Sequence, residues 1–162
     1  MLRQTYSNGQ IVYSVYMMHK YVNENKLHIY NISLTRFKYT QNWKIWGDWN
    51  DPYGDQNRWS INDVLKDPNK YKRDYKNILK AKLSYPIICV YTPLDLFIIV
   101  DGYHRYAKSI LQKKKTIKSY VFTDPKIIKK FKLGKQTKSI WKKIDKMKQK
   151  DFDILYKKRF VK

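Results

Sequence analysis

Five consecutive residues near the middle of the chain combine a carboxylate, a glycine, an imidazole and a guanidinium: Asp101, Gly102, Tyr103, His104 and Arg105. An apolar run precedes them and a helical pattern follows them. The first amide groups of a helix have no acceptor inside the helix, and the helix dipole favours negative charge there. Glycine lets the main chain turn sharply and lets an anion approach closely. The pattern therefore predicts a phosphate-binding turn between a strand and a helix.

Each side chain of this turn has a role in the prediction. Arg105 can form two hydrogen bonds to phosphate oxygens, and His104 can donate a hydrogen bond or a proton. Asp101 stands at the carboxyl end of the expected strand, where open α/β folds place ligands, and is the candidate base or Mg²⁺ ligand. Asp101 and His104 are thus the candidate catalytic residues, and Tyr103 or an aromatic residue of a loop is expected against the base of a nucleotide. The structural alternative is that Asp101 caps the helix while His104 and Arg105 are solvated.

The elements expected around the turn give an α/β fold. Residues 85–91 and 96–100 are apolar runs typical of buried strands, with a turn at residues 92–95 between them. Residues 103–113 carry one apolar helical face, and residues 116–122 form a third strand. A small mixed sheet with flanking helices is expected.

The N-terminal part predicts a helix capped by Ser14 and ended by residues 23–25, with a hairpin strand over residues 11–17 as the alternative. Residues 27–32 alternate apolar and polar side chains, as a half-buried strand does. Ser60 is expected to cap a short helix.

Between these elements, residues 39–59 hold four tryptophans among turn-forming residues and predict a long ordered loop packed on the domain. Asp48, Asp51 and Asp55 lie in this loop and either hold Mg²⁺ with a nucleotide or accept local hydrogen bonds. Asp63 is expected in the first turn of the helix after Ser60, where it complements the helix dipole. A further helix is expected from Asp67-Pro68 toward Leu79.

The strand, the Asp-Gly-Tyr-His-Arg turn and the helix after it resemble the ParB/sulfiredoxin superfamily of nucleotide-binding domains. The resemblance covers residues 74–122 well and residues 27–67 loosely, and it is closest to proteins marked by Asp-Gly-Met-His-Arg or Asp-Gly-Val-His-Arg. It implies phosphate contacts from Gly102, His104 and Arg105. It also implies a nucleoside di- or triphosphate of the ATP or CTP class as ligand, with Mg²⁺ as a candidate ion.

Departures from the family pattern narrow what the resemblance implies. Sulfiredoxin has a cysteine, and ParB a glutamate, at the position that Tyr103 fills here. The related free-serine kinase uses an upstream catalytic glutamate, whereas Glu24, the only glutamate of this chain, is poorly placed for that role. Nucleotide binding is therefore expected, and whether the nucleotide is turned over stays open.

Charge and composition bound the other possibilities. The 162 residues carry a net charge of +22, so polyanions are the expected partners, although an AT-rich genome also enriches lysine without selection for binding. No apolar run is long enough for a membrane helix, and the start has no apolar core of a signal peptide. One cysteine, Cys89, lies in an apolar run and is expected to be a buried, inert thiol. These features predict a cytoplasmic or nuclear protein, with a virus factory or virion as further locations.

The last 39 residues differ from the rest of the chain. Residues 124–162 hold fifteen Lys and Arg and four Asp, and their apolar residues are spaced for three short amphipathic helices, the first stopped at Gly134. We therefore expect a ParB-like domain at residues 1–123 and a lysine-rich helical extension at residues 124–162 that binds nucleic acid. The alternative to a nucleotide-binding domain is a non-catalytic DNA- or RNA-binding or packaging protein, including a viral particle component. The oligomeric state stays open.

Overall fold

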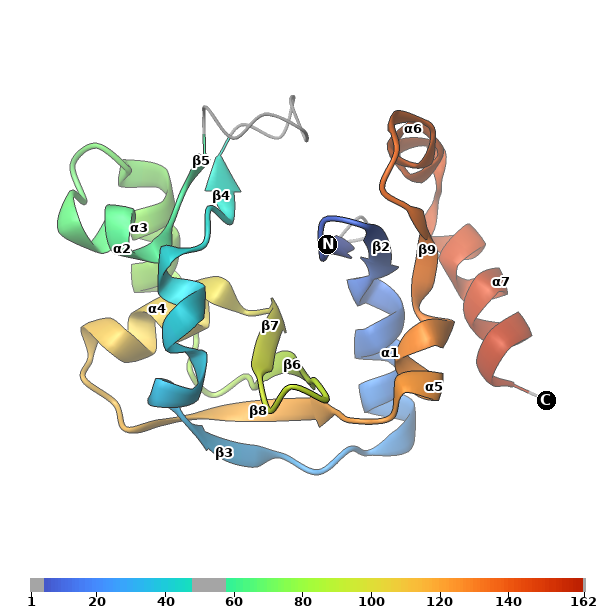
Figure 1. Ribbon diagram of the computed structural model, residues 1–162, viewed down its shortest axis with the longest axis horizontal. Coiled ribbons are helices and arrows are strands. Elements are labelled where there is room, and N and C mark those ends of the chain that lie inside the picture. The colour runs from blue at the N-terminus through green and yellow to red at the C-terminus, as the bar shows by residue number, and fades with distance from the viewer. Residues whose placement is uncertain (1–4, 48–57, 162) are drawn as a thin grey trace. The chain divides into compact units, whose positions relative to one another are not determined.

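The computed structural model describes residues 5–47 and 58–161, and these residues form two compact units. The central unit comprises residues 29–121, and the terminal unit comprises residues 1–28 together with residues 122–162. Helices and strands are mixed in both units, which confirms the predicted α/β class. Figure 1 shows the two sets of elements.

A four-stranded sheet organises the central unit. Its order is β3-β8-β6-β7, where β3 spans Tyr30–Ser33, β8 Thr116–Phe122, β6 Ile87–Tyr91 and β7 Phe97–Asp101. β3 pairs with β8, and β6 pairs with β7, in both cases antiparallel. The connection from β7 to β8 passes through a helix, α4 (Tyr103–Leu111), so the candidate turn leaves the sheet from its edge strand.

Four helical segments cluster beside this sheet (Figure 1): η1 (Leu34–Asn42), α2 (Ile61–Lys66), α3 (Lys72–Lys80) and α4. A two-stranded ribbon, β4 (Trp46–Gly47) with β5 (Arg58–Trp59), precedes α2. The apolar faces of these elements meet in one core, and its fully buried members are Phe37, Ile61, Val64, Ile78, Ile87, Cys89, Ile99, Tyr106 and Ala107.

The terminal unit brings together segments from both parts of the sequence. Its three-stranded sheet has the order β1-β2-β9, formed by Thr5–Ser7, Ile11–Ser14 and Lys132–Lys135. Its helices are α1 (Val15–Asn25), α5 (Pro125–Lys130), α6 (Lys138–Lys146) and α7 (Gln149–Phe160). α7 packs against α1 (Figure 1). Aromatic rings fill the space between these helices: Tyr21, Phe122, Phe131, Tyr156 and Phe160.

Several predicted elements are confirmed. Ser14 caps α1 by accepting a hydrogen bond from the amide of Met17, and the competing strand exists as well but ends at Ser14. Ser60 caps α2, with Asp63 in the first turn as expected. The third strand, β8, has the predicted bounds.

Other predictions are wrong in detail. The helix expected from Asp67-Pro68 begins only at Lys72. Asp67 is the C-cap of α2, and its carboxylate accepts a hydrogen bond from the amide of Lys70 in the turn between the two helices. Gly134 does not stop a helix: it lies in strand β9, where it pairs with Val12 of β2. The tryptophan-rich segment, residues 39–59, contains the end of η1 together with β4 and β5, and its residues 48–57 lie outside the described residues.

The N-terminal 28 residues, which we expected in the ParB-like domain, share a compact unit with the segment after Phe122. The predicted division at residues 123/124 lies next to the point where the chain returns to the terminal unit. No helix among the described residues has the length and apolar character that crossing a bilayer requires. Cys89 is buried as predicted, and burial raises the pKa of its thiol to about 12, which makes it a poor nucleophile.

Candidate functional site

The predicted turn is built as a sharp transition from strand to helix. β7 ends at Asp101, and Gly102 is the N-cap of α4 with a φ of +105°, a conformation that side chains strongly disfavour. A Cβ atom on Gly102 would also lie 2.6 Å from Cγ2 of the buried Ile87. Both the backbone angle and the packing therefore require glycine at this position.

Arg105 folds back over this glycine. A Cβ atom on Gly102 would lie 2.8 Å from Nη2 of Arg105 and 3.0 Å from its Nε, so the guanidinium rests on the first turn of α4. Nη2 donates a 2.8 Å hydrogen bond to Oδ2 of Asp101, which holds the arginine in place. The Nε atom is buried and has no hydrogen-bond partner among the described residues. The turn thus holds an arginine whose charge is compensated by Asp101 and whose buried Nε is not used as a donor among the described residues.

The amide groups add to this cationic character. The first hydrogen bond of α4 that returns to the turn runs from the amide of Tyr106 to the carbonyl of Gly102, over 2.9 Å. The amides of His104 and Arg105 precede it and have no acceptor within the helix. The helix dipole therefore acts at the same place as the guanidinium, and the two together favour an anion.

His104 precedes Arg105 in the first turn of α4. Its ring stacks on that of Trp46, with centroids 4.6 Å apart and planes inclined by 14°. Its Nε2 atom is buried and lies 3.5 Å from Oδ1 of Asp74, and about a third of the side chain remains exposed. Strand β4 and helix α3 therefore fix the orientation of the imidazole.

Asp74 is the carboxylate that the sequence interpretation missed. It is almost completely buried, and its Oδ2 accepts a 2.8 Å hydrogen bond from the indole of Trp59. Arg73 Nη2 lies 3.8 Å from the same oxygen. The sequence contained one signal for Asp74. It stands four residues before Ile78, on the apolar face of α3, and a charged side chain on a buried face usually has a polar partner.

These surroundings shift the titration of His104. Burial lowers the pKa of its imidazole below the ordinary value, and the cations Arg105 and Arg73 act in the same direction. Asp74 opposes the shift without cancelling it. The imidazole is therefore neutral near pH 7. Because Nε2 faces a carboxylate, the proton is favoured there, which leaves Nδ1 as an acceptor.

Tyr103 serves the fold through its hydroxyl group, which donates a 2.5 Å hydrogen bond to the carbonyl of Ile99. Its ring packs against the core of the central unit. The position against a nucleobase that the sequence suggested for Tyr103 stays a prediction.

The described residues offer no cluster of side chains that supports the predicted Mg²⁺ site. No group of three or more His, Cys, Asp or Glu side chains lies together in the part of the chain that the structure describes. Asp48, Asp51 and Asp55 fall outside that part. Asp101 is paired with Arg105, and its role as a Mg²⁺ ligand stays a prediction.

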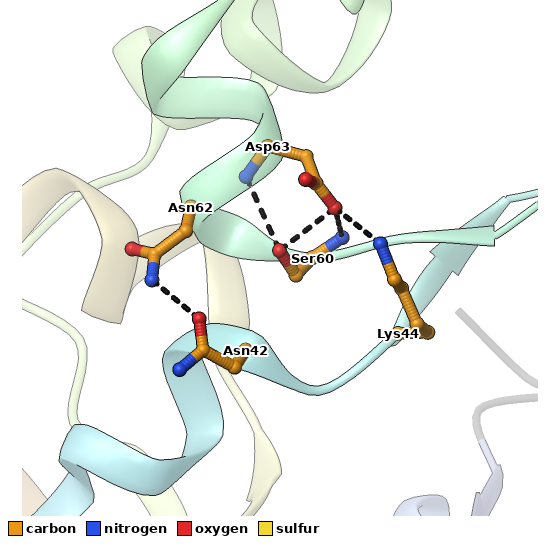
Figure 2. A network of polar contacts seen from close by, with 5 residues as sticks. All are labelled: Asn42, Lys44, Ser60, Asn62 and Asp63. Carbon is orange, nitrogen blue, oxygen red and sulfur yellow. Dashed lines mark hydrogen bonds and ion pairs between the residues drawn. The ribbon is translucent and has the colours of Figure 1, made fainter.

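Asp63 has a structural role. It completes a capping box with Ser60, whose amide donates to its Oδ2 over 2.8 Å, and it accepts a 2.7 Å hydrogen bond from Lys44 (Figure 2). The lysine and the amide together lower the pKa of Asp63 to about 2. All of these contacts fix the start of α2.

No protein-family model matches the chain, and comparisons with curated proteins and with solved structures found no match either. The resemblance to the ParB/sulfiredoxin superfamily stays a prediction. Function is therefore argued from the geometry of the turn.

Proposed function

We propose that the central unit binds the phosphate groups of a nucleotide at the first turn of α4. The observation that carries this proposal is the guanidinium of Arg105, which lies directly over Gly102 with a buried Nε that has no hydrogen-bond partner within residues 5–47 and 58–161. To bond this buried donor and the helix amides at once, a phosphate oxygen requires the Arg105 side chain to move outward from Gly102, and guanidinium–phosphate hydrogen bonds are among the stronger ones in proteins. Asp101 orients the arginine while leaving this donor unused.

The neutral imidazole of His104 gives the same site a chemical function. With Nε2 directed at Asp74, its Nδ1 can accept a proton from an attacking hydroxyl or water. Phosphoryl transfer or nucleotide hydrolysis is the reaction class that fits such a base beside bound phosphates. Mg²⁺, when bound, would neutralise charge on the phosphates, and Asp101 is the candidate ligand.

Isothermal calorimetry with ADP, ATP and CTP, each with and without Mg²⁺, tests the proposal. We expect Arg105→Ala to abolish binding. Arg36→Ala is the matched control, because Arg36 also forms an ion pair with an aspartate, Asp95. Asp95 lies before β7, whereas Asp101, the partner of Arg105, is the last residue of β7. The control should bind as the wild type does. Equal affinity of the wild type and Arg105→Ala would refute the proposal.

A second variant separates binding from stability. Asp101→Asn removes the negative charge next to the proposed phosphate site but leaves an acceptor for Arg105. If the turn binds phosphate, the affinity without Mg²⁺ should rise or stay the same, since the repulsion between Asp101 and the ligand is lost. With Mg²⁺ the affinity should fall if Asp101 is the metal ligand. If the ion pair were only structural, both variants would lower the melting temperature and no nucleotide would bind either.

A second candidate function, nucleic-acid binding, rests on the C-terminal segment. Four large apolar side chains of this segment are buried, namely Phe131, Ile144, Phe152 and Tyr156, whereas Ile154 is 62% exposed. Its exposed lysines are distributed over α5, α6 and α7 and include Lys126, Lys129, Lys130, Lys138, Lys142, Lys143, Lys146, Lys150, Lys157 and Lys158. A folded surface with this charge is suited to a phosphate backbone.

Deletion of residues 124–162 is a poor test of this function, because they form one compact unit with residues 1–28. The sharper test is Lys142→Ala with Lys146→Ala, one turn apart on α6, against Lys66→Ala with Lys76→Ala in the central unit. Both pairs are exposed and remove equal charge. A role for the C-terminal segment predicts that only the α6 pair reduces the salt dependence of DNA binding, by about two in log–log slope. Equal effects of the two pairs would point to unspecific attraction by the overall charge.

A further inference from the structure

Residues 38–44, Lys-Tyr-Thr-Gln-Asn-Trp-Lys, form a stretch with no acidic and no aliphatic side chain. Two of its aromatic residues face solvent, since Tyr39 is 58% and Trp43 41% exposed. Single exposed aromatic rings are common on protein surfaces, but two within five residues beside two lysines make a local aromatic and cationic surface. This stretch therefore calls for a functional account apart from the turn at Gly102.

The two neighbours of Trp43 are anchored to helix α2. The side-chain oxygen of Asn42 accepts a 2.7 Å hydrogen bond from Asn62, and Lys44 Nζ lies 2.7 Å from Oδ2 of Asp63. Figure 2 shows both contacts, with Asn42 and Lys44 directed at the first turn of α2. The amide of Trp43 itself donates to the carbonyl of Thr40 over 3.2 Å. The backbone that carries this exposed indole is thus held on both sides.

The inner face of the same segment is used for packing. Phe37 and Thr40 are buried, and Gln41 Nε2 donates a 3.1 Å hydrogen bond to the hydroxyl of Tyr106. The fold therefore fixes η1 through one face and leaves Tyr39 and Trp43 outside. A preorganised aromatic surface of this kind binds without the entropic cost of ordering a loop.

The charge around this surface selects the kind of partner. Lys38 Nζ lies 5.3 Å from the centroid of the Tyr39 ring, at the exposed side of the segment. Asp63, a nearby acidic group, is paired with Lys44, so its charge is compensated. Exposed aromatics combined with cations are typical of surfaces that bind single-stranded nucleic acid. Protein interfaces are also enriched in Tyr and Trp but are depleted in lysine, which is present at both ends of this stretch.

We propose that Trp43 is a stacking site for a base of single-stranded DNA or RNA, with Lys38 near the phosphate backbone. A single strand is the required form, because only its bases offer a free face to the indole. This site uses other residues than the proposed phosphate site and the lysines of α5 to α7. It gives the chain a preference for unpaired strands that backbone neutralisation alone does not provide.

Fluorescence anisotropy with labelled oligothymidylate of about 20 nucleotides, longer than the site of a typical single-strand-binding module, tests the proposal. We expect Trp43→Ala to weaken binding by about tenfold, within the range measured for the loss of one stacked base. Tyr85→Ala is the matched control, because Tyr85 is 59% exposed and lies outside this segment. It should bind as the wild type does. Trp43→Phe should retain part of the affinity, because it keeps an aromatic face.

A duplex of the same length and the salt dependence complete the experiment. Trp43→Ala should bind the duplex within about twofold of the wild type, with an unchanged salt slope, since stacking releases no counterions. Lys38→Ala should reduce the slope by up to about one. Unchanged single-strand affinity in Trp43→Ala, or an equal loss on duplex, would overturn the proposal. Arg105→Ala should leave single-strand binding intact, so failure here and failure of the nucleotide proposal can be told apart.

Discussion

The imidazole of His104 directs its Nε2 atom at the buried carboxylate of Asp74, 3.5 Å away. Asp74 is the one group in these surroundings that raises the pKa of the imidazole, against burial and two arginines. Replacing it with asparagine should lower the pKa of His104 further. An NMR titration of the histidine ring signals measures this, with His19 and His28 as internal references. Asp67→Asn, which removes an exposed carboxylate, should leave the His104 signal unchanged.

The lowered pKa of His104 also predicts how stability depends on pH. A histidine whose pKa is lower in the folded than in the unfolded state binds a proton more readily when unfolded. The protein should therefore lose stability as the pH falls below about 6.5, the value of an unperturbed imidazole. His104→Gln should lose this part of the pH dependence in denaturant titrations between about pH 8 and pH 5. Parallel pH profiles for both proteins would contradict the assignment.

Gly102 should tolerate no side chain. Gly102→Ala combines an unfavourable φ with contacts below 3 Å to Ile87 and Arg105, and should cost more than about 2 kcal/mol of stability. Gly9→Ala is the control, since Gly9 also has a positive φ of +88° but has no atom within 4 Å of the added Cβ. It should cost about 1 kcal/mol, from the backbone alone. Similar losses in thermal unfolding would show that the close packing at Gly102 contributes nothing.

The network around Asp63 should stabilise the central unit above acidic pH. Its pKa of about 2 lies below the ordinary value of 3.8, so its contribution is present above about pH 4 and is lost as the pH falls toward 2. Asp63→Asn should flatten the acid unfolding curve over this window, measured by circular dichroism. Ser60→Ala, which removes the N-cap of α2, should cost about 1 kcal/mol at neutral pH. An acid transition of Asp63→Asn identical to that of the wild type would exclude this role.

Local signals in the sequence were sufficient for several elements. Ser14 and Ser60 predicted helix starts, because a serine followed by an apolar helical pattern is a local feature. The strand–glycine–helix transition at Gly102 was predictable for the same reason. The expected stop at Gly134 failed because β9 exists only through its pairing with β2, more than a hundred residues earlier. Local propensity carries no information on such a partner.

The candidate site shows the same limit. The sequence predicted which residues of the turn are polar, but it did not reveal that Nη2 of Arg105 donates a hydrogen bond to Asp101. Trp46 and Asp74 were not identified as the neighbours of His104, because β4 and α3 reach it only through tertiary packing. The local sequence pattern thus predicted the turn at Gly102, whereas the neighbours of its side chains depend on the tertiary fold.

The chain leaves the terminal unit at residue 28 and returns to it at residue 122, which makes the central unit an insertion. Its two ends run as neighbouring strands, with Tyr30 opposite Ser119, so they enter and leave side by side. During synthesis on the ribosome, residues 29–121 can therefore fold as soon as they emerge, whereas β2 and α1 must wait for β9 and α7. We therefore expect a cloned segment of residues 29–121 to fold on its own, which circular dichroism would check before ligand screening.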